Sequence, residues 1–272
     1  MQASKLIASK KALAIPVTYL FLFVSLIALV SMTYGFAITK IGTRSAAIKV
    51  TVAKQNMQAL DNTVQAVVWS FGASEIVYMD DCGSVFRAVP SAKRLTLNFT
   101  DEQTFSSIVF NNSLGKVFYN LEPSEFNDAG LYVRGDGRAI INQTAYSMSQ
   151  LNFVAGGEAQ EIVLCYRPLV TVAVVGTQDG RPLNLARIHI INLSYSQNLG
   201  LTEKFYLKIA SLNVTANMYP YVFNQSTISI ALKANFDGVQ TTVWLPISSN
   251  TNGAVVNLET MVCNIKIQSA GA

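Results

Sequence analysis

The chain begins with a long apolar segment. Between Ala12 and Thr39 there is no Asp, Glu, Lys, Arg or His. As a helix this segment would extend roughly 40 Å at about 1.5 Å per residue, more than the ~30 Å hydrocarbon core of a bilayer. The pattern therefore predicts one membrane-spanning helix. A signal peptide is disfavoured, because its apolar region is usually only about 7–15 residues long.

An apolar stripe continues beyond this span. Its positions recur at helical spacing: Ile41, Ile48, Val52, Leu60, Val64 and Val67. Polar and charged residues fall on the other faces: Arg44, Lys49, Lys54, Gln58 and Asp61. This periodicity indicates an amphipathic helix. Because no proline occurs between Val17 and Val89, we expect one continuous helix from about Ala14 to Trp69. The alternative is a break near Gly42 and a separate second helix.

From Ser74 onward the pattern is typical of strands. Alternating segments rich in Val, Ile, Thr, Tyr and Phe occupy 94–100, 160–166, 186–193, 204–209 and 226–233. Asp-Gly pairs within 135–138, 178–181 and 236–239 suit tight hairpin turns. We therefore predict a mainly β protein with one long N-terminal helix followed by an antiparallel β-sandwich.

The predicted organisation has three parts. A basic leader or cytoplasmic head covers 1–11, and a transmembrane helix with its amphipathic extension covers 12–70. An extracellular β-sandwich domain covers 72–272. Two small β units meeting near residue 156, where the chain contains Gly156-Gly157, are the alternative to a single sandwich.

Charge is distributed unevenly along the chain. The net charge is +4, yet residues 1–60 contain no acid and carry Lys5, Lys10, Lys11, Lys40, Arg44, Lys49 and Lys54. Basic residues lie on both sides of the span, so the positive-inside rule does not choose its orientation. Their position indicates contact with lipid headgroups or neighbouring subunits rather than with nucleic acid.

Acceptor motifs for N-glycosylation favour one orientation. The pattern N-x-[ST] occurs at Asn98, Asn111, Asn142, Asn192, Asn213 and Asn224, and nowhere before residue 98. We therefore expect a single-pass protein with a cytoplasmic N-terminus and a glycosylated domain at the cell surface. Chance occurrence in a chain rich in Asn, Ser and Thr is the alternative.

The cysteines and the histidine give little indication of chemistry. Cys82, Cys165 and Cys263 are too few and too scattered for a disulfide framework or a zinc site. Buried free thiols are favoured, with a bridge between Cys165 and Cys263 as the alternative. His189 is the only histidine, which excludes paired-histidine metal sites, and it fits a partly covered strand position beside Arg187.

No motif of an enzyme is apparent. The chain contains no Gly-x-Ser-x-Gly elbow, phosphate-binding loop or dinucleotide fingerprint. We therefore predict a protein that is not an enzyme and needs no cofactor or metal. Arg134-Gly-Asp136 matches a triplet known in cell adhesion, but the following Gly137-Arg138 makes a hairpin turn the simpler interpretation. Trp69, near the end of the helical pattern, is expected to pack the helix against the β domain.

The start of the chain resembles a known family. Lys10-Lys11-Ala12 directly precedes Leu13 and an apolar helix, which is similar to the processing site of archaeal prepilins and pre-archaellins. The whole plan resembles archaeal type IV pilin-like proteins. This resemblance implies that a membrane prepilin peptidase recognises Lys11 and Ala12 and cleaves before Leu13. The early Pro16 and the absence of an early acidic residue depart from bacterial pilins, so no subunit register based on such a carboxylate is implied.

Together these features predict a structural subunit of a type IV pilus-like surface filament. The subunit would assemble with copies of itself through the N-terminal helix. The alternative is a membrane-anchored surface protein that does not polymerise and whose β domain binds a sugar, a surface or an envelope partner. An exported enzyme is a third and weaker interpretation.

Overall fold

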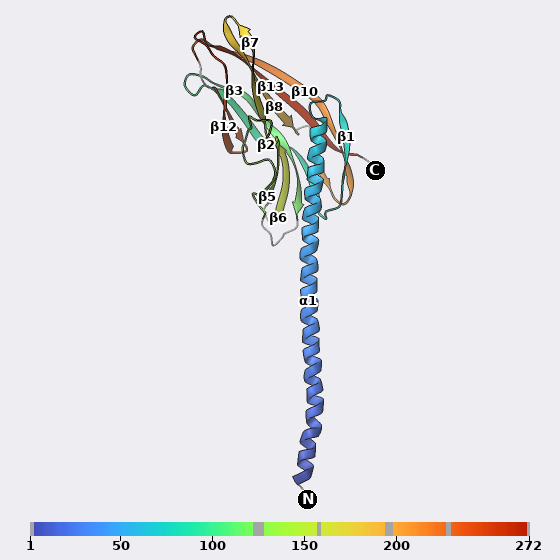
Figure 1. Cartoon of the computed structure of the whole chain (residues 1–272). Helices are drawn as coiled ribbons and strands as arrows, with labels where there is room; N and C mark the ends of the chain where they lie inside the picture. The colour runs from blue at the N-terminus through green and yellow to red at the C-terminus, as the bar shows by residue number, and fades with distance from the viewer. Residues whose placement is uncertain (1–2, 122–127, 157–158, 194–197, 227–229, 271–272) are drawn as a thin grey trace. The chain divides into compact units, whose positions relative to one another are not determined.

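The computed structural model describes residues 3–121, 128–156, 159–193, 198–226 and 230–270, with side chains from residue 16 onward except at Ala159. It contains one long N-terminal helix and a mostly antiparallel β domain, as predicted (Figure 1). The chain divides into two compact units, Met1–Ile48 and Lys49–Ala272. The first unit is helical, and the second contains the end of the same helix and all the strands.

Helix α1 runs from Ala3 to Val67 without a break. The helix starts earlier than the sequence pattern predicted. The prediction of one continuous helix is confirmed, because residues 40–45 around Gly42 are helical throughout. Glycine costs only about 1 kcal/mol in a helix interior, which is too little to end a helix with strongly helical neighbours. From Pro16 onward α1 is long and apolar enough to cross a membrane.

Thirteen strands follow the helix within the described ranges. They are β1 (Ser74–Met79), β2 (Val85–Thr100), β3 (Ser106–Leu121), β4 (Tyr132–Arg134), β5 (Ser149–Gly156), β6 (Ala159–Tyr166), β7 (Leu169–Gln178), β8 (Arg181–Asn192), β9 (Leu199–Leu201), β10 (Phe205–Phe223), β11 (Ile230–Phe236), β12 (Val239–Leu245) and β13 (Ala254–Ala270).

The strands form two sheets. The 5-stranded sheet has the order β1-β10-β13-β8-β7, and only its β13–β8 pair is parallel. The 8-stranded sheet has the order β12-β11-β2-β3-β6-β5-β4, with β9 paired to β2. The stretch near residue 156 lies at the β5–β6 hairpin, where Gly156 is paired with Ala159, and is therefore internal to one sheet.

The last turns of α1 belong to the core of the second unit. The predicted stripe is buried at Leu60, Val64 and Val67, and Met57 and Ala53 extend it toward the N-terminus. These side chains pack against strands of both sheets: β1, β10 and β13 of one, and β2, β3, β5 and β6 of the other. Helix stability here comes from burial of one face rather than from propensity alone.

A second core lies where the two sheets pack on each other without the helix. Alternate residues of β2 (Leu95, Leu97 and Phe99) face alternate residues of β8 and β13 in this cluster. The period of two therefore produces the burial that the sequence pattern predicted for the strand segment 94–100.

Two of the three Asp-Gly pairs form the predicted hairpin turns. Asp179-Gly180 connects β7 to β8, and Asp237-Gly238 connects β11 to β12, all with positive φ. The third prediction was wrong, because residues 135–138 form an irregular loop rather than a hairpin. The reason is the charged pairing of Asp136, which is described below.

Candidate membrane helix and helix-anchoring site

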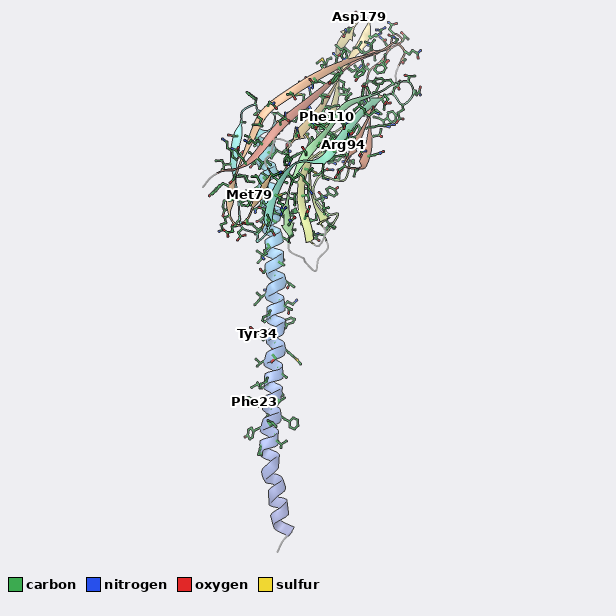
Figure 2. The ribbon with its side chains drawn as sticks, turned by 180° about the vertical axis from the view of Figure 1, so that it is seen from behind. Phe23, Tyr34, Met79, Arg94, Phe110 and Asp179 are labelled. Carbon is green, nitrogen blue, oxygen red and sulfur yellow. The ribbon has the colours of Figure 1, made fainter. Side chains whose placement is uncertain are left out.

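The apolar part of α1 presents large side chains to its surroundings on every face. Residues between Val17 and Ile41 are exposed, and Phe23 and Tyr34 illustrate this, with 60% and 68% of their surface accessible (Figure 2). An apolar surface of this extent is unusual for a soluble monomer and is typical of surfaces that contact lipid or protein. The uncharged segment ends at Thr39, and the next basic residues are Lys40 and Arg44.

The residues of the predicted processing site lie at the start of the same helix. Lys11, Ala12 and Leu13 have helical backbone, and their side chains lie outside the described part of the chain. Cleavage before Leu13 stays a prediction.

A buried acid on α1 fixes the helix to the 8-stranded sheet. The Asp61 carboxylate is fully buried and forms an ion pair with Arg134 of β4. Its other oxygen accepts hydrogen bonds from the Ser149 hydroxyl at 2.6 Å and the Tyr166 hydroxyl at 2.9 Å. We call Asp61, Arg134, Ser149 and Tyr166 the Asp61 cluster. Burial, followed by the Asp61 charge, raises the pKa of Tyr166, so this hydroxyl remains a donor.

The cluster could not be anticipated from periodicity. The sequence pattern placed Asp61 on a face away from the apolar stripe, whereas the structure buries it with full pairing. Burying a carboxylate is tolerated only when opposite charge and hydrogen bonds replace its hydration. One feature of the sequence could have indicated that Asp61 is buried. It is the single acid of the helix, and it lies between the core residues Leu60 and Val64.

Further polar contacts fix the rotation and the axial position of this helix end. Asn56 donates to the Asp80 carbonyl at 2.7 Å and accepts from the Asp80 amide at 3.1 Å. Just beyond the helix, the Trp69 ring meets the His189 ring edge-on with centroids 5.1 Å apart. This contact confirms that Trp69 packs the helix end against the β domain.

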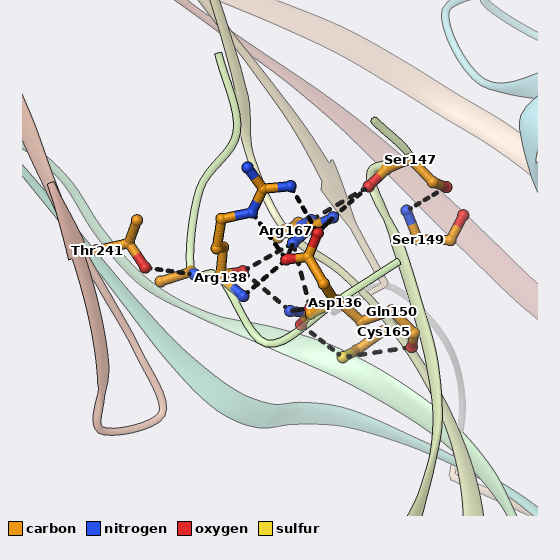
Figure 3. A network of polar contacts seen from close by, with 9 residues as sticks. Asp136, Arg138, Ser147, Ser149, Gln150, Cys165, Arg167 and Thr241 are labelled. Carbon is orange, nitrogen blue, oxygen red and sulfur yellow. Dashed lines mark hydrogen bonds and ion pairs between the residues drawn. The ribbon is translucent and has the colours of Figure 1, made fainter. Parts of the chain in front are cut away.

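The loop after β4 is organised by a second set of charges. Arg167, fully buried directly after β6, forms an ion pair with Asp136 and donates to the Ser147 carbonyl (Figure 3). Asp136 also receives two hydrogen bonds from the Arg138 side chain. The Arg138 guanidinium, and next that of Arg167, hold the pKa of the Asp136 carboxyl well below its usual range. This network holds an irregular segment in one conformation.

Both charged side chains of the Arg134-Gly-Asp136 triplet form ion pairs within the protein. Arg134 is paired with the buried Asp61, while Asp136 is paired with Arg138 and Arg167. Between them Gly135 has φ +78°, and an added Cβ would lie 2.2 Å from the Ser149 carbonyl oxygen. The triplet is therefore an internal structural element, and only glycine fits its middle position.

The asparagines of the glycosylation motifs differ in accessibility. Asn111 in β3, Asn142 in a loop and Asn224 after β10 are exposed, and Asn98 and Asn213 are half-buried. Asn192 is buried and donates to the Asn264 side chain at 2.7 Å. A glycan on Asn192 would require this buried amide to leave its partner.

The cysteines are free thiols. Cys82, Cys165 and Cys263 are all buried and unbridged. Cys165 lies in the core between the sheets and Cys263 in the core around the helix, so the bridge considered between them is not formed. Burial raises the pKa of the Cys82 and Cys165 thiols, which makes them poor nucleophiles.

His189 takes the partly covered strand position that was predicted. Burial, together with the neighbouring Arg187 charge, lowers its pKa. Among the residues that the structure describes, no group of three His, Cys, Asp or Glu side chains could hold a metal ion.

One cleft on the β domain has a volume of about 680 Å³. It lies between the β2–β3 turn and the end of β10, and Asp101, Phe105 and Tyr221 line it. The Thr104 hydroxyl and three backbone amides bind the Asp101 carboxylate and lower its pKa. Its charge is therefore already satisfied by the turn itself.

Comparison of the chain with protein-family models, with curated proteins and with solved structures finds no match.

Proposed function

We propose that this chain is a structural subunit of a type IV pilus-like filament at the cell surface. It assembles with copies of itself through the apolar N-terminal helix and displays its β domain, glycosylated at exposed asparagines, outside the cell. The N-terminus faces the cytoplasm before assembly.

The observation that carries this proposal is the contrast within α1. Its first part exposes large apolar side chains on every face, whereas its last turns are buried in the β domain. A helix that only needed a partner on one side would show a single apolar stripe. An apolar surface all round suits lipid before assembly and a bundle of sister helices afterwards, since both remove it from water.

Pro16 supports the removal of a leader. Proline has no N–H, so within a helix it leaves the carbonyl four residues earlier, that of Ala12, without its usual partner. After cleavage before Leu13, Pro16 is the fourth residue of the mature chain. The first four N–H groups of a helix have no helical partner, so processing removes the cost of this proline.

The Asp61 cluster supports a mechanical role. A filament transmits force from the β domain to the helix, and the two must not separate under load. Buried ionic contacts resist sliding because any shift leaves a charge without its partner. In the second unit the contacts of Asn56 and Asp61 meet this requirement.

A charge in the apolar helix tests the proposal. Leu26 is 60% exposed and lies within the apolar segment. We expect Leu26→Glu to abolish fibres, since a charge at the centre of an apolar helix costs roughly 3 kcal/mol per subunit. Leu26→Met is the matched control and should assemble normally. The readout is electron microscopy of material sheared from cells and sedimented.

The outcomes separate the interpretations. Fibres from the wild type and Leu26→Met but not from Leu26→Glu support the proposal. Membrane-bound wild-type protein without fibres favours an anchored surface protein that does not polymerise. Normal fibre yield from Leu26→Glu contradicts assembly through this helix.

A further inference from the structure

The 5-stranded sheet leaves backbone unpaired at both of its sides. β1 covers only the first part of β10, from Phe205 to Ala210, with one further pair of contacts at Ser211. From Asn213 to Phe223, β10 pairs with β13 alone among the described strands. On the opposite side, the structure gives β7 no strand partner other than β8 within the described ranges, apart from a short bridge at its beginning.

Both free stretches are exposed and uncharged. Residues 173–178 of β7 and 215–220 of β10 are exposed at six successive positions, so neither face of the sheet is covered there. Each stretch exposes large apolar side chains, Val174 and Val175 in β7 and Met218 and Tyr219 in β10. Edge strands are usually protected by charged residues, which both stretches lack.

Through the registers of β8 and β13, residues 171–176 of β7 lie at the level of residues 218–222 of β10, so the unpaired backbone of the two strands overlaps there. Thr171 of β7 is opposite Arg187 of β8. Arg187 is opposite Glu259 of β13, and Glu259 is opposite Met218 of β10. A sideways displacement of a second copy along the hydrogen-bonding direction therefore brings residues 171–176 of its β7 next to residues 218–222 of β10.

The strand directions also match. β10 is antiparallel to β13, β13 is parallel to β8, and β8 is antiparallel to β7, so β7 and β10 run in the same direction. A second copy placed beside the first in the same orientation would add its β7 to β10 as a parallel pair. All helices would then keep one direction, as subunits leaving a single membrane require.

We propose that the free edge of β10 is paired with β7 of a second copy of this chain, which continues the 5-stranded sheet from subunit to subunit. This inference rests on the proposed filament function. The contact joins two different surfaces, β10 of one subunit and β7 of the next. A contact of this kind adds subunits without limit unless the rotation between neighbouring subunits closes them into a ring. The natural twist between adjacent strands adds rotation at each step, which gives a helical arrangement.

Two features of these edges favour a specific pairing over indiscriminate aggregation. Pro220 in β10 removes one backbone donor from the strand. A shift in register between Val174 and Gly176 bends β7. An unrelated strand would meet both irregularities without compensating contacts.

Engineered cysteines test the pairing. In Thr171→Cys/Met218→Cys, the two thiols lie at matching levels of β7 and β10. Mild oxidation of assembled fibres should give a ladder of dimers, trimers and longer species on a non-reducing gel. Each single variant should give no ladder. The pair Met218→Cys/Val239→Cys, with one thiol on β12, is the mismatched control. The native cysteines are buried and should not contribute.

Charge substitution gives a second measurement that does not depend on disulfide geometry. Val174 in β7 and Val239 in β12 are exposed to similar extents, 56% and 49%, and each lies close to a hairpin turn. Val174→Lys should reduce the fibre yield several-fold, because it places a charge on the pairing edge. Val239→Lys should leave the yield unchanged.

The results distinguish this inference from the filament function itself. The strand pairing is overturned if fibres of the matched cysteine variant give no ladder and Val174→Lys leaves the fibre yield unchanged. Both results would leave the filament function intact. A dimer and nothing longer from Met218→Cys alone indicates a symmetric β10–β10 contact and also overturns it. Absence of fibres from the wild type overturns both.

Discussion

Replacement of Asp61 by alanine should destabilise the second unit strongly. The substitution removes the acceptor of two buried hydroxyls, those of Ser149 and Tyr166, and the partner of Arg134. A buried polar group left without a partner costs about 1–3 kcal/mol, so the two hydroxyls together account for about 2–6 kcal/mol.

The guanidinium of Arg134 adds little to this loss. Its side chain is 33% accessible and also donates to Asn62 at 3.0 Å, so it keeps a partner and reaches water. We therefore expect Asp61→Ala to lower the free energy of unfolding by about 3–5 kcal/mol, the range for breaking a buried pair. For a domain of this size that lowers the melting temperature by roughly 10 °C.

The assay is thermal and urea unfolding of the full chain in detergent, followed by tryptophan fluorescence. Trp69 reports on the helix end directly, through its contact with His189. Asp61→Asn should lose less, because an amide oxygen still accepts the hydroxyl hydrogen bonds. Lys233→Gln, which breaks an exposed pair with Glu102, is the control and should change stability by at most about 1 kcal/mol. Equal effects of Asp61→Ala and Lys233→Gln would refute the anchoring role.

Three further results should follow. Gly135→Ala should lower the free energy of unfolding in urea by more than about 2 kcal/mol, because Gly135 has a positive φ and an added Cβ would clash with Ser149. Gly130→Ala should lower it by only about 1 kcal/mol, because an added Cβ there has no atom within 4 Å. Equal losses would contradict the role of the close approach at Gly135. Burial keeps the pKa of His189 in the folded protein below the 6.5 of an unfolded histidine. As the pH decreases through about 6.5, the unfolded chain therefore takes up a proton while the folded chain does not, and the free energy of unfolding should fall. His189→Gln should weaken this dependence, and an unchanged slope between pH 5 and 7.5 would exclude the histidine as its source. The three native thiols should remain unlabelled by a thiol reagent until the chain unfolds, and rapid labelling of the folded protein would contradict their burial.

Periodicity predicted the main elements because burial has a simple geometric signature. The stripe Leu60, Val64 and Val67 predicted the buried face of α1, and strict alternation predicted the strand at 94–100. Asp-Gly predicted two hairpins because both residues tolerate positive φ.

The same dipeptide failed at 136–137 because a tertiary interaction dominated. The Asp136 carboxylate binds Arg138 nearby and Arg167, which lies directly after β6 and far along the sequence, and these ion pairs hold the segment in an irregular loop. A local turn preference of this kind is weaker than two charge-assisted contacts. Nothing in the spacing of residues indicates which arginine a carboxylate will meet after folding.

The Asp61 cluster escaped prediction for a related reason. Asp61 on the helix meets residues of three different strands, at sequence separations of 73, 88 and 105 residues. A helical pattern treats a lone acid as solvent-facing, since most acids are. The exposed edges of β7 and β10 were equally invisible in the sequence, because edge position is a property of strand order.

The central claim is that the apolar helix holds processed subunits together in a surface filament. Mass spectrometry of the N-terminus of protein from sheared, sedimented fibres tests it most directly. The account predicts a chain that begins at Leu13 in those fibres. A chain with an intact N-terminus, recovered from membranes and never in sedimenting fibres, would contradict it.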